Sequence, residues 1–130
     1  MQVEVVSADR VVWSGESTNI IAKTTDGEIG ILPGHAPVLA VLQPSAVVIF
    51  VADGKQREVI AVDGGFVSVS QGRVSILSEY AAVADEVSVG EAERELADAQ
   101  QRLDGGEGSE DDRKQLQRAT AQLRAAQKRQ

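Results

Sequence analysis

The residues that could do acid–base chemistry in this chain gather around its single histidine, His35. Asp26 and Glu28 stand shortly before it, and an imidazole beside a carboxylate can act as a general base near neutral pH. Catalysis also needs an acid and a stabilising group that converge on the same point, and no nearby serine or aspartate has the spacing of a triad. The pattern therefore favours His35 as a loop or interface residue over His35 as a catalytic base.

Motifs that hold nucleotides, metals or nucleophiles are absent from the sequence. No Gly-x-x-x-x-Gly-Lys-Ser/Thr occurs, and Gly27, Gly30 and Gly34 do not have the spacing of a dinucleotide-binding fingerprint. The chain has no cysteine, so it has no thiol nucleophile or zinc–thiolate site. A net charge of −7 argues against nucleic-acid binding, which needs a basic face. These exclusions predict a binding or coupling module without a cofactor or metal.

The histidine belongs to a stretch, residues 26–37, that holds three of the twelve glycines and two of the three prolines. Proline fixes its own φ angle and makes the residue before it extended, and glycine adopts conformations closed to other residues. We therefore expect Leu32 and Ala36 to be extended, with a sharp turn at Pro33-Gly34. The stretch also has apolar residues that need a core and polar residues left at its rim, which are Ile29, Ile31 and Leu32, and Glu28 and His35.

The chain up to about residue 85 has few charges and many β-branched residues, which is typical of strands. Short apolar runs alternate with turn signals such as Asp-Gly, a pattern that indicates a β-sandwich or small barrel. The expected strands are residues 3–6, 11–13, 18–23, 38–42, 47–51, 58–62, 66–70 and 74–77. After residue 85, alanine, glutamate, glutamine and arginine dominate, which favours helices.

Two helices are expected in this second part. The first begins at residues 88–91, where Ser88 and Glu91 have the spacing of a capping box, and the second begins at residues 109–112. Glycines at 105–108 separate them, so the helices should form an antiparallel hairpin. Their apolar stripes are Val89, Ala92, Leu96, Ala99 and Leu103, then Leu116, Ala119, Leu123 and Ala126. The predicted fold is α+β, an N-terminal antiparallel β-sandwich (1–85) followed by a C-terminal two-helix hairpin (86–130).

The hairpin should be weakly held, because its seams contain much alanine and alanine buries little apolar surface. From Arg113 onward the chain has cations and no acid, whereas acids dominate the first helix. One interpretation is two solvated faces that attract each other across the hairpin. The other is a detachable basic helix that binds an acidic partner. Charge alone favours the first interpretation.

Several segments together resemble the ε subunit of bacterial F-type ATP synthases. They are residues 5–8, 13–15, 27–37, 63–67 and 121–124, and the most specific is Gly-Glu-Ile-Gly-Ile-Leu-Pro-Gly-His-Ala-Pro. The resemblance runs along nearly the whole chain. It implies the same fold: a flattened β-sandwich followed by a helical hairpin.

The resemblance also implies a role. In the family, the sandwich binds the γ subunit and rests on the membrane c-ring, and both subunits turn as the central stalk that couples proton flow to ATP synthesis. The subunit is not itself an enzyme, and it lies peripherally at the cytoplasmic face of the plasma membrane. The implied interface with γ and the c-ring consists of Glu28, Ile29, Leu32, Pro33, Gly34 and His35.

The hairpin is the regulatory element in bacterial members of the family, where it can extend into the catalytic head and block ATP hydrolysis. The resemblance implies that cations of the second helix then meet acidic segments of the α and β subunits. The cations concerned are Arg113, Lys114, Arg118 and Arg124.

One segment departs from the family pattern. Some members bind ATP through Ile/Leu-Asp-x-x-Arg-Ala at the first helix, and the matching residues 87–92 here have Ser88 in place of the acid and Glu91 in place of the arginine. An acid repels phosphate where a cation would bind it. We therefore expect weak or no ATP binding, with Ser88 and Glu91 serving as a helix cap.

Two other functions are compatible with the residues alone. One is a free-standing scaffold or chaperone-like module built from a sandwich and a coiled-coil tail. The other is a small hydrolase that uses His35 with Asp26 or Glu28. No apolar run approaches the length of a membrane span, and the N-terminus lacks the features of a signal peptide, so we expect a soluble protein.

Overall fold

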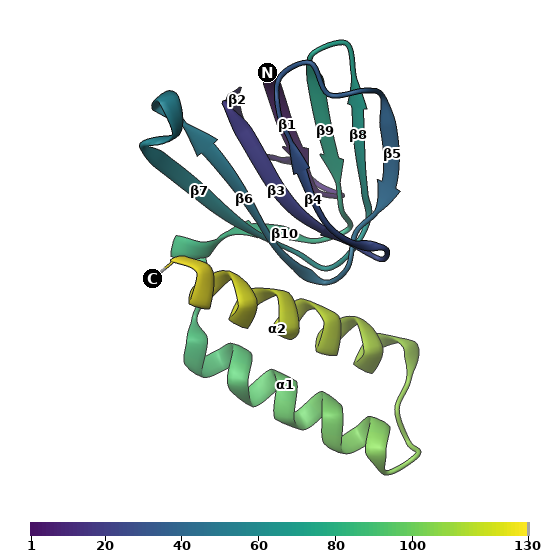
Figure 1. The fold of residues 1–130 in the computed structure, drawn as a ribbon. Helices are drawn as coiled ribbons and strands as arrows, with labels where there is room; N and C mark the ends of the chain where they lie inside the picture. The colour runs from purple at the N-terminus through teal and green to yellow at the C-terminus, as the bar shows by residue number, and fades with distance from the viewer. Residues whose placement is uncertain (130) are drawn as a thin grey trace.

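The computed structural model describes residues 1–129, which form a two-sheet sandwich followed by two α-helices (Figure 1). Sheet A has the strand order β2-β1-β9-β8-β5, and sheet B has the order β10-β7-β6-β3-β4. The strands are β1 (Gln2–Val6), β2 (Val11–Glu16), β3 (Asn19–Thr24), β4 (Gly27–Ile31), β5 (Val38–Val41), β6 (Ser45–Val51), β7 (Gln56–Val62), β8 (Phe66–Ser70), β9 (Arg73–Leu77) and β10 (Ala81–Val83). The helices are α1 (Val89–Asp104) and α2 (Glu110–Arg129).

The predicted fold class is confirmed, and every expected strand segment forms a strand with small differences at its ends. Strand β4 lies inside the glycine-rich stretch that was expected to be a constrained corner, and β10 was not expected. Alanine has little preference for strands, yet Ala82 of β10 pairs with Ala61 of β7. One neighbouring pair is parallel: β1 runs alongside β9, with Val5 opposite Ile76. The other strand pairs are antiparallel.

The core between the sheets is filled by the inward-facing residues of alternating strands. β-Branched side chains dominate it because they pack well on a pleated surface. Five isoleucines have no exposed surface: Ile20, Ile31, Ile49, Ile60 and Ile76. Trp13 packs against the margin of this core. The core gives the sandwich a rigid body on which surface residues are held in place.

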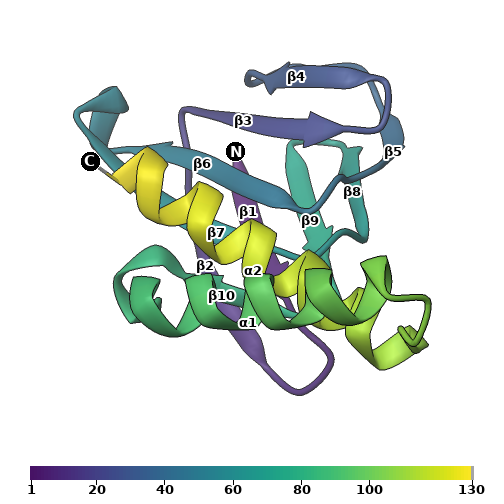
Figure 2. The same ribbon diagram turned by 90° about the horizontal axis from the view of Figure 1, so that it is seen from below.

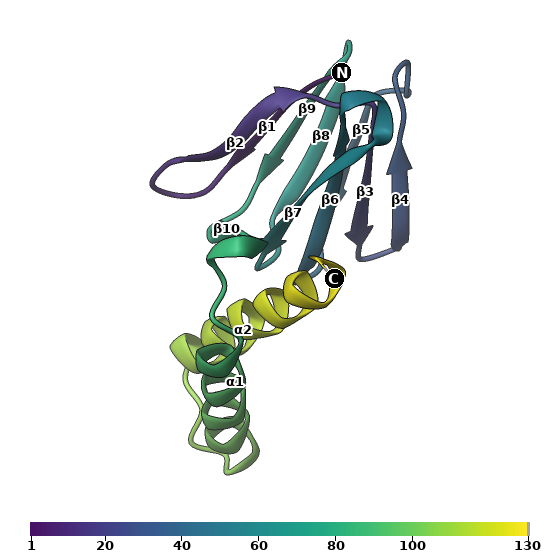
Figure 3. The ribbon, with the colours of Figure 1, turned by 90° about the vertical axis from the view of Figure 1, so that its left-hand side faces the viewer.

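Helix α2 lies across the outer face of sheet B, over β6 and β7, and α1 packs on the side of α2 that faces away from the sandwich (Figures 2 and 3). Ala121 and Ala125 are fully buried against the sheet, in a cluster with Val48, Val59 and Ala61. These two alanines lie on a second apolar face of α2, which the single expected stripe did not include. Their small side chains let the helix backbone approach the sheet closely.

A short link through Gly64-Gly65 crosses from β7 in sheet B to β8 in sheet A. Gly65 has a φ angle of +98°, and a Cβ atom there would clash with the Leu77 carbonyl oxygen and lie 2.9 Å from Ser78 Cα. Glycine is therefore required both by the backbone conformation and by the close approach of β9.

Replacing Gly65 with alanine should lower the free energy of unfolding by roughly 2–5 kcal/mol, which combines left-handed backbone strain with a steric cost. Gly72 is a matched control, because its φ angle is +76° but a Cβ atom there would meet open space. Gly72→Ala should cost only about 1–2 kcal/mol. Urea denaturation measures both values, and equal losses would contradict the steric explanation.

Candidate functional site

The β3–β4 hairpin opens the stretch at residues 26–37. Thr24 and Gly27 pair across the turn, and Thr24 Oγ1 donates to the Gly27 carbonyl (2.7 Å) and accepts from the Asp26 N–H (3.1 Å). The Asp-Gly signal thus indicated the hairpin correctly. Gly27, however, is the first residue of β4 and does not lie in the turn itself.

A second turn follows β4 at Leu32–His35. The His35 N–H donates to the Leu32 carbonyl (3.0 Å), and Gly34 has a φ angle of +83°. Proline followed by a left-handed glycine is the pattern of a type II β-turn, so the sharp turn predicted at Pro33-Gly34 is confirmed. Ile31 is fully buried, but the side chain of Leu32 is 61% exposed. The expectation that Leu32 needs the sandwich core was therefore wrong, because the turn points it outward.

The structure does not bring His35 together with the nearby carboxylates. Within residues 1–129, no hydrogen bond or ion pair joins His35 to Asp26 or Glu28, and its Nδ1 lies 2.6 Å from the carbonyl oxygen of Ala36. Glu28 and His35 also lie at opposite ends of β4, which spans about 15 Å. The His35–carboxylate pair on which the hydrolase alternative depends is therefore not formed in this structure.

A row of exposed apolar side chains crosses the outer face of sheet A. Strand register places its members on one rung: Val41 is opposite Phe66, Phe66 opposite Leu77, Leu77 opposite Val6, and Val6 opposite Val11. We call Val11, Val6, Leu77, Phe66 and Val41 the apolar row. Phe66 and Leu77 are each about half exposed, at 49% and 48%.

Sequence reasoning missed the apolar row, although a signal for it exists. The alternation in β8 buries Val67 and Val69, so Phe66 must point to the opposite, solvent-facing side of the sheet. An exposed aromatic residue that continues a row of exposed apolar neighbours marks a candidate interaction surface.

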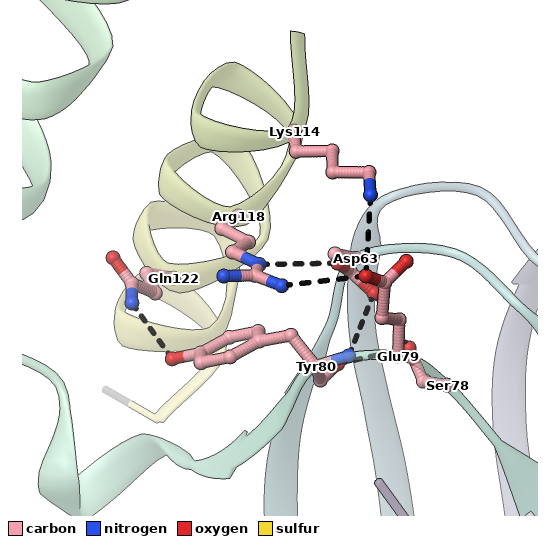
Figure 4. Close-up of polar contacts among 7 residues, drawn as sticks. All are labelled: Asp63, Ser78, Glu79, Tyr80, Lys114, Arg118 and Gln122. Atoms are coloured by element: carbon pink, nitrogen blue, oxygen red, sulfur yellow. Dashed lines mark hydrogen bonds and ion pairs between the residues drawn. The ribbon is translucent and has the colours of Figure 1, made fainter. Parts of the chain in front are cut away.

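The cations of α2 meet acids of the sandwich (Figure 4). Arg118 Nε lies 3.4 Å from Asp63 Oδ2, and Arg118 Nη2 lies 3.9 Å from Glu79 Oε1. Lys114 Nζ lies 3.4 Å from the same oxygen of Glu79. Further along α2, Arg129 pairs with Asp85 at 3.1 Å, and Arg124 donates to the carbonyl of Pro44.

Fewer ion pairs join the two helices to each other than join α2 to the sandwich, contrary to the expectation from the sequence. One ion pair in the described residues joins α1 to α2, and it has the opposite polarity, with Arg102 Nε 2.6 Å from Asp112 Oδ1. Within residues 1–129, Arg113 forms an ion pair only with Glu110 of its own helix, at 3.9 Å. The interpretation of solvated faces attracting across the hairpin was therefore wrong, since the cations mainly reach the sandwich.

The start of each helix is capped, as expected. Ser88 Oγ accepts from the Glu91 N–H (3.4 Å), although the Glu91 carboxylate makes no return bond to Ser88. At α2, Ser109 Oγ accepts from the Asp112 N–H (3.3 Å) and Asp112 Oδ2 accepts from the Ser109 N–H (3.0 Å). The Ser109 N–H and then Arg102 lower the pKa of the Asp112 carboxyl below its ordinary value of 3.8.

Residues 1–129 contain neither a candidate metal cluster nor a membrane-spanning helix. No group of three or more histidine or acidic side chains there could hold a metal ion. Neither helix in this part of the chain is long and apolar enough to cross a membrane.

Comparison with known proteins gives a consistent result. Residues 1–84 match the family described as "ATP synthase, Delta/Epsilon chain, beta-sandwich domain". A protein of Cutibacterium acnes named "ATP synthase epsilon chain" is 50% identical over 128 residues, covering 98% of this chain and 87% of the relative. A Streptomyces avermitilis protein of the same name is 45% identical over 125 residues, covering 96% of this chain and 94% of the relative.

Solved structures share the fold. A chain of the Euglena gracilis mitochondrial ATP synthase, in a structure of OSCP, F1 and the c-ring, superposes with a TM-score of 0.74 at 22% identity. That match covers 98% of this chain and 79% of the other. A chain of the Tetrahymena thermophila mitochondrial ATP synthase, in a structure of the central stalk and c-ring, gives a TM-score of 0.52 at 20% identity, with 66% and 68% covered.

Proposed function

The chain belongs to the family of ATP synthase epsilon chains, and from this premise we propose that it is a rotor subunit of the central stalk of an F-type ATP synthase. In this role it is a non-catalytic subunit that helps couple proton flow through the membrane ring to ATP synthesis in the catalytic head. Its partners are the γ subunit, the c-ring and the α and β subunits. It lies peripherally at the cytoplasmic face of the bacterial plasma membrane.

The observation that carries this proposal is the apolar row. We assign the γ subunit to the outer face of sheet A, because a row of exposed apolar residues with a half-exposed aromatic side chain beside the central strand has the composition of an interface core. On the next rung of this face, Ser68 and Ser75 lie between Leu39, which is 72% exposed, and Glu4, a charged residue that borders the apolar row. A rotor that transmits torque needs a rigid partner surface, and this face is part of the sandwich.

Replacing Phe66 with aspartate should weaken binding of the γ subunit at least about tenfold, because a charge would be buried where an aromatic anchor packs. Binding is measured with purified γ by calorimetry or by co-purification of the complex. Val89→Asp is the matched control, since Val89 is 44% exposed on α1 and should leave γ binding unchanged. Unchanged binding by the Phe66 variant would reject this face as the γ interface.

We propose that the Leu32–His35 turn contacts the c-ring. Its proline and glycine fix the backbone before binding, so the contact loses little conformational entropy. Leu32, Pro33, Gly34 and His35 form this contact, whereas Glu28 and Ile29 lie farther along β4 and would serve a separate part of the stalk interface.

Replacing Gly34 with valine should disturb this turn, because Gly34 holds a positive φ angle in open space. We expect lower ATP-driven proton pumping by assembled membranes, with binding of the isolated γ subunit unchanged. Gly106→Val is a matched control, as Gly106 has a φ angle of +78° in the link between the helices. Normal pumping by the Gly34 variant would contradict a c-ring contact at this turn.

We further propose that the hairpin restrains ATP hydrolysis. Lys114, Arg118 and Arg124, which we assign to acidic segments of the α and β subunits, contact the sandwich in this structure. Their release would free them for the head, and Arg113 is already exposed. The start of α1 has Glu91 at the position where a phosphate-binding cation would be needed. We therefore expect that ATP does not stabilise the docked hairpin.

Truncation after Val87 should leave assembly and ATP synthesis intact and raise ATP hydrolysis by the isolated complex. The removed residues contribute nothing to the sandwich core, so the shortened chain retains both proposed docking surfaces. Hydrolysis rates of complexes with full-length and truncated chains provide the measurement. Equal rates would show that this hairpin is not inhibitory.

A further inference from the structure

Asp63 differs from the other acids that meet α2 because its carboxylate is buried. Its side chain is 6% exposed, whereas the side chains of Glu79 and Asp85 are 56% and 78% exposed. Ser78 Oγ donates to Asp63 Oδ1 at 2.8 Å, and the Tyr80 N–H donates to the same oxygen at 3.1 Å. The sandwich therefore satisfies one carboxylate oxygen by itself.

The second carboxylate oxygen of Asp63 has its hydrogen-bond donor on α2. Asp63 Oδ2 accepts from Arg118 Nε at 3.4 Å, and Arg118 is the cation of α2 that reaches it (Figure 4). Arg118 also lies over the Tyr80 ring, with Cζ 5.4 Å from the ring centroid. Gln122 Nε2, one turn along α2, donates to the Tyr80 hydroxyl at 2.7 Å. Asp63 and Tyr80 together thus hold one face of α2 by polar contacts.

Departure of α2 affects these acids differently. Glu79 and Asp85 are exposed, so water would solvate them in place of their cations, and such surface pairs add little to binding. Asp63 would keep its two sandwich hydrogen bonds but lose Arg118, and its burial, to which the neighbouring residues of α2 contribute, would fall as water entered. While α2 is docked, however, water screens the Asp63–Arg118 attraction less than it screens the exposed pairs, so this pair resists undocking more than the others.

We propose that Asp63 is a latch for the hairpin, and that the Asp63–Arg118 pair sets the fraction of molecules in which α2 leaves the sandwich. The evidence for the latch is the set of contacts between Asp63, Tyr80 and Arg118 within this chain. Its effect on the enzyme rests on the proposed inhibitory function of the hairpin, since Arg118 cannot pair with Asp63 and with an acid of the head at the same time.

Hydrogen exchange of the α2 amides in the full-length isolated subunit tests the latch. An undocked two-helix hairpin of this size is only marginally helical, so exchange of these amides reports how often α2 leaves the sheet. Asp63→Asn keeps an acceptor for Ser78 and Tyr80 but removes the charge. It should speed exchange about tenfold, the factor expected when a charge-assisted hydrogen bond becomes a neutral one. Arg118→Gln should give a similar acceleration.

Arg113→Gln is the matched control, because it removes one positive charge from the same helix at a residue whose side chain is 70% exposed. It should leave exchange unchanged. Unchanged exchange in both latch variants, or an equal acceleration by Arg113→Gln, would overturn the latch. If Asp63→Asn also speeds amide exchange in β8, that variant disturbs the sandwich itself. The effect of Arg118→Gln on α2 exchange then tests the latch, because this substitution lies on the helix.

The assembled enzyme separates the latch from the proposed inhibition. Asp63→Asn should lower ATP hydrolysis, because more hairpins are free to extend, and it should have no effect in a chain truncated after Val87. Faster α2 exchange without any change in hydrolysis would support the latch and reject the inhibitory role of the hairpin.

Discussion

The structure depends on the close approach of α2 to sheet B, which only small side chains permit. Ala121 and Ala125 bring the helix axis near the strands, and this approach places Arg118 within reach of Asp63. Because alanine buries little apolar surface, the contact between α2 and sheet B contributes little to the free energy of unfolding. A helix held in this way requires polar contacts to fix its position, and it can leave without exposing a large hydrophobic surface.

The two parts of the molecule consequently differ in stiffness. The sandwich has a continuous core of fully buried isoleucine and valine, and its surface residues are fixed by strand register. The hairpin has narrow alanine-containing seams and contacts the sandwich through one helix. Such a division suits the proposed role, in which the sandwich transmits force and the tail changes position, because the free-energy difference between two tail positions can stay at a few kcal/mol.

Local patterns in the sequence predicted most elements, and long-range pairing accounts for what they missed. Alternation predicted the strands, serine caps predicted both helix starts, and Pro33-Gly34 predicted the turn. Strand β4 was missed because Gly27 and Gly30 weaken its pattern, and β10 because alanine favours helices. The second apolar face of α2 and the Asp63–Arg118 pair depend on how the hairpin folds back on the sheet, which no local periodicity encodes. The resemblance to a known family, which the comparisons confirm, gave a role that the composition alone could not.

The parallel pairing of β1 with β9 determines when the sandwich can form during synthesis. Strand β1 lies inside sheet A, between β2 and β9, so one of its edges stays open until residues 73–77 have left the ribosome. Pairing of the first strand with the ninth gives a long chain closure, and such topologies fold slowly. The nascent chain therefore carries an unpaired strand edge until β9 has been synthesised, and such an edge is open to pairing with other chains.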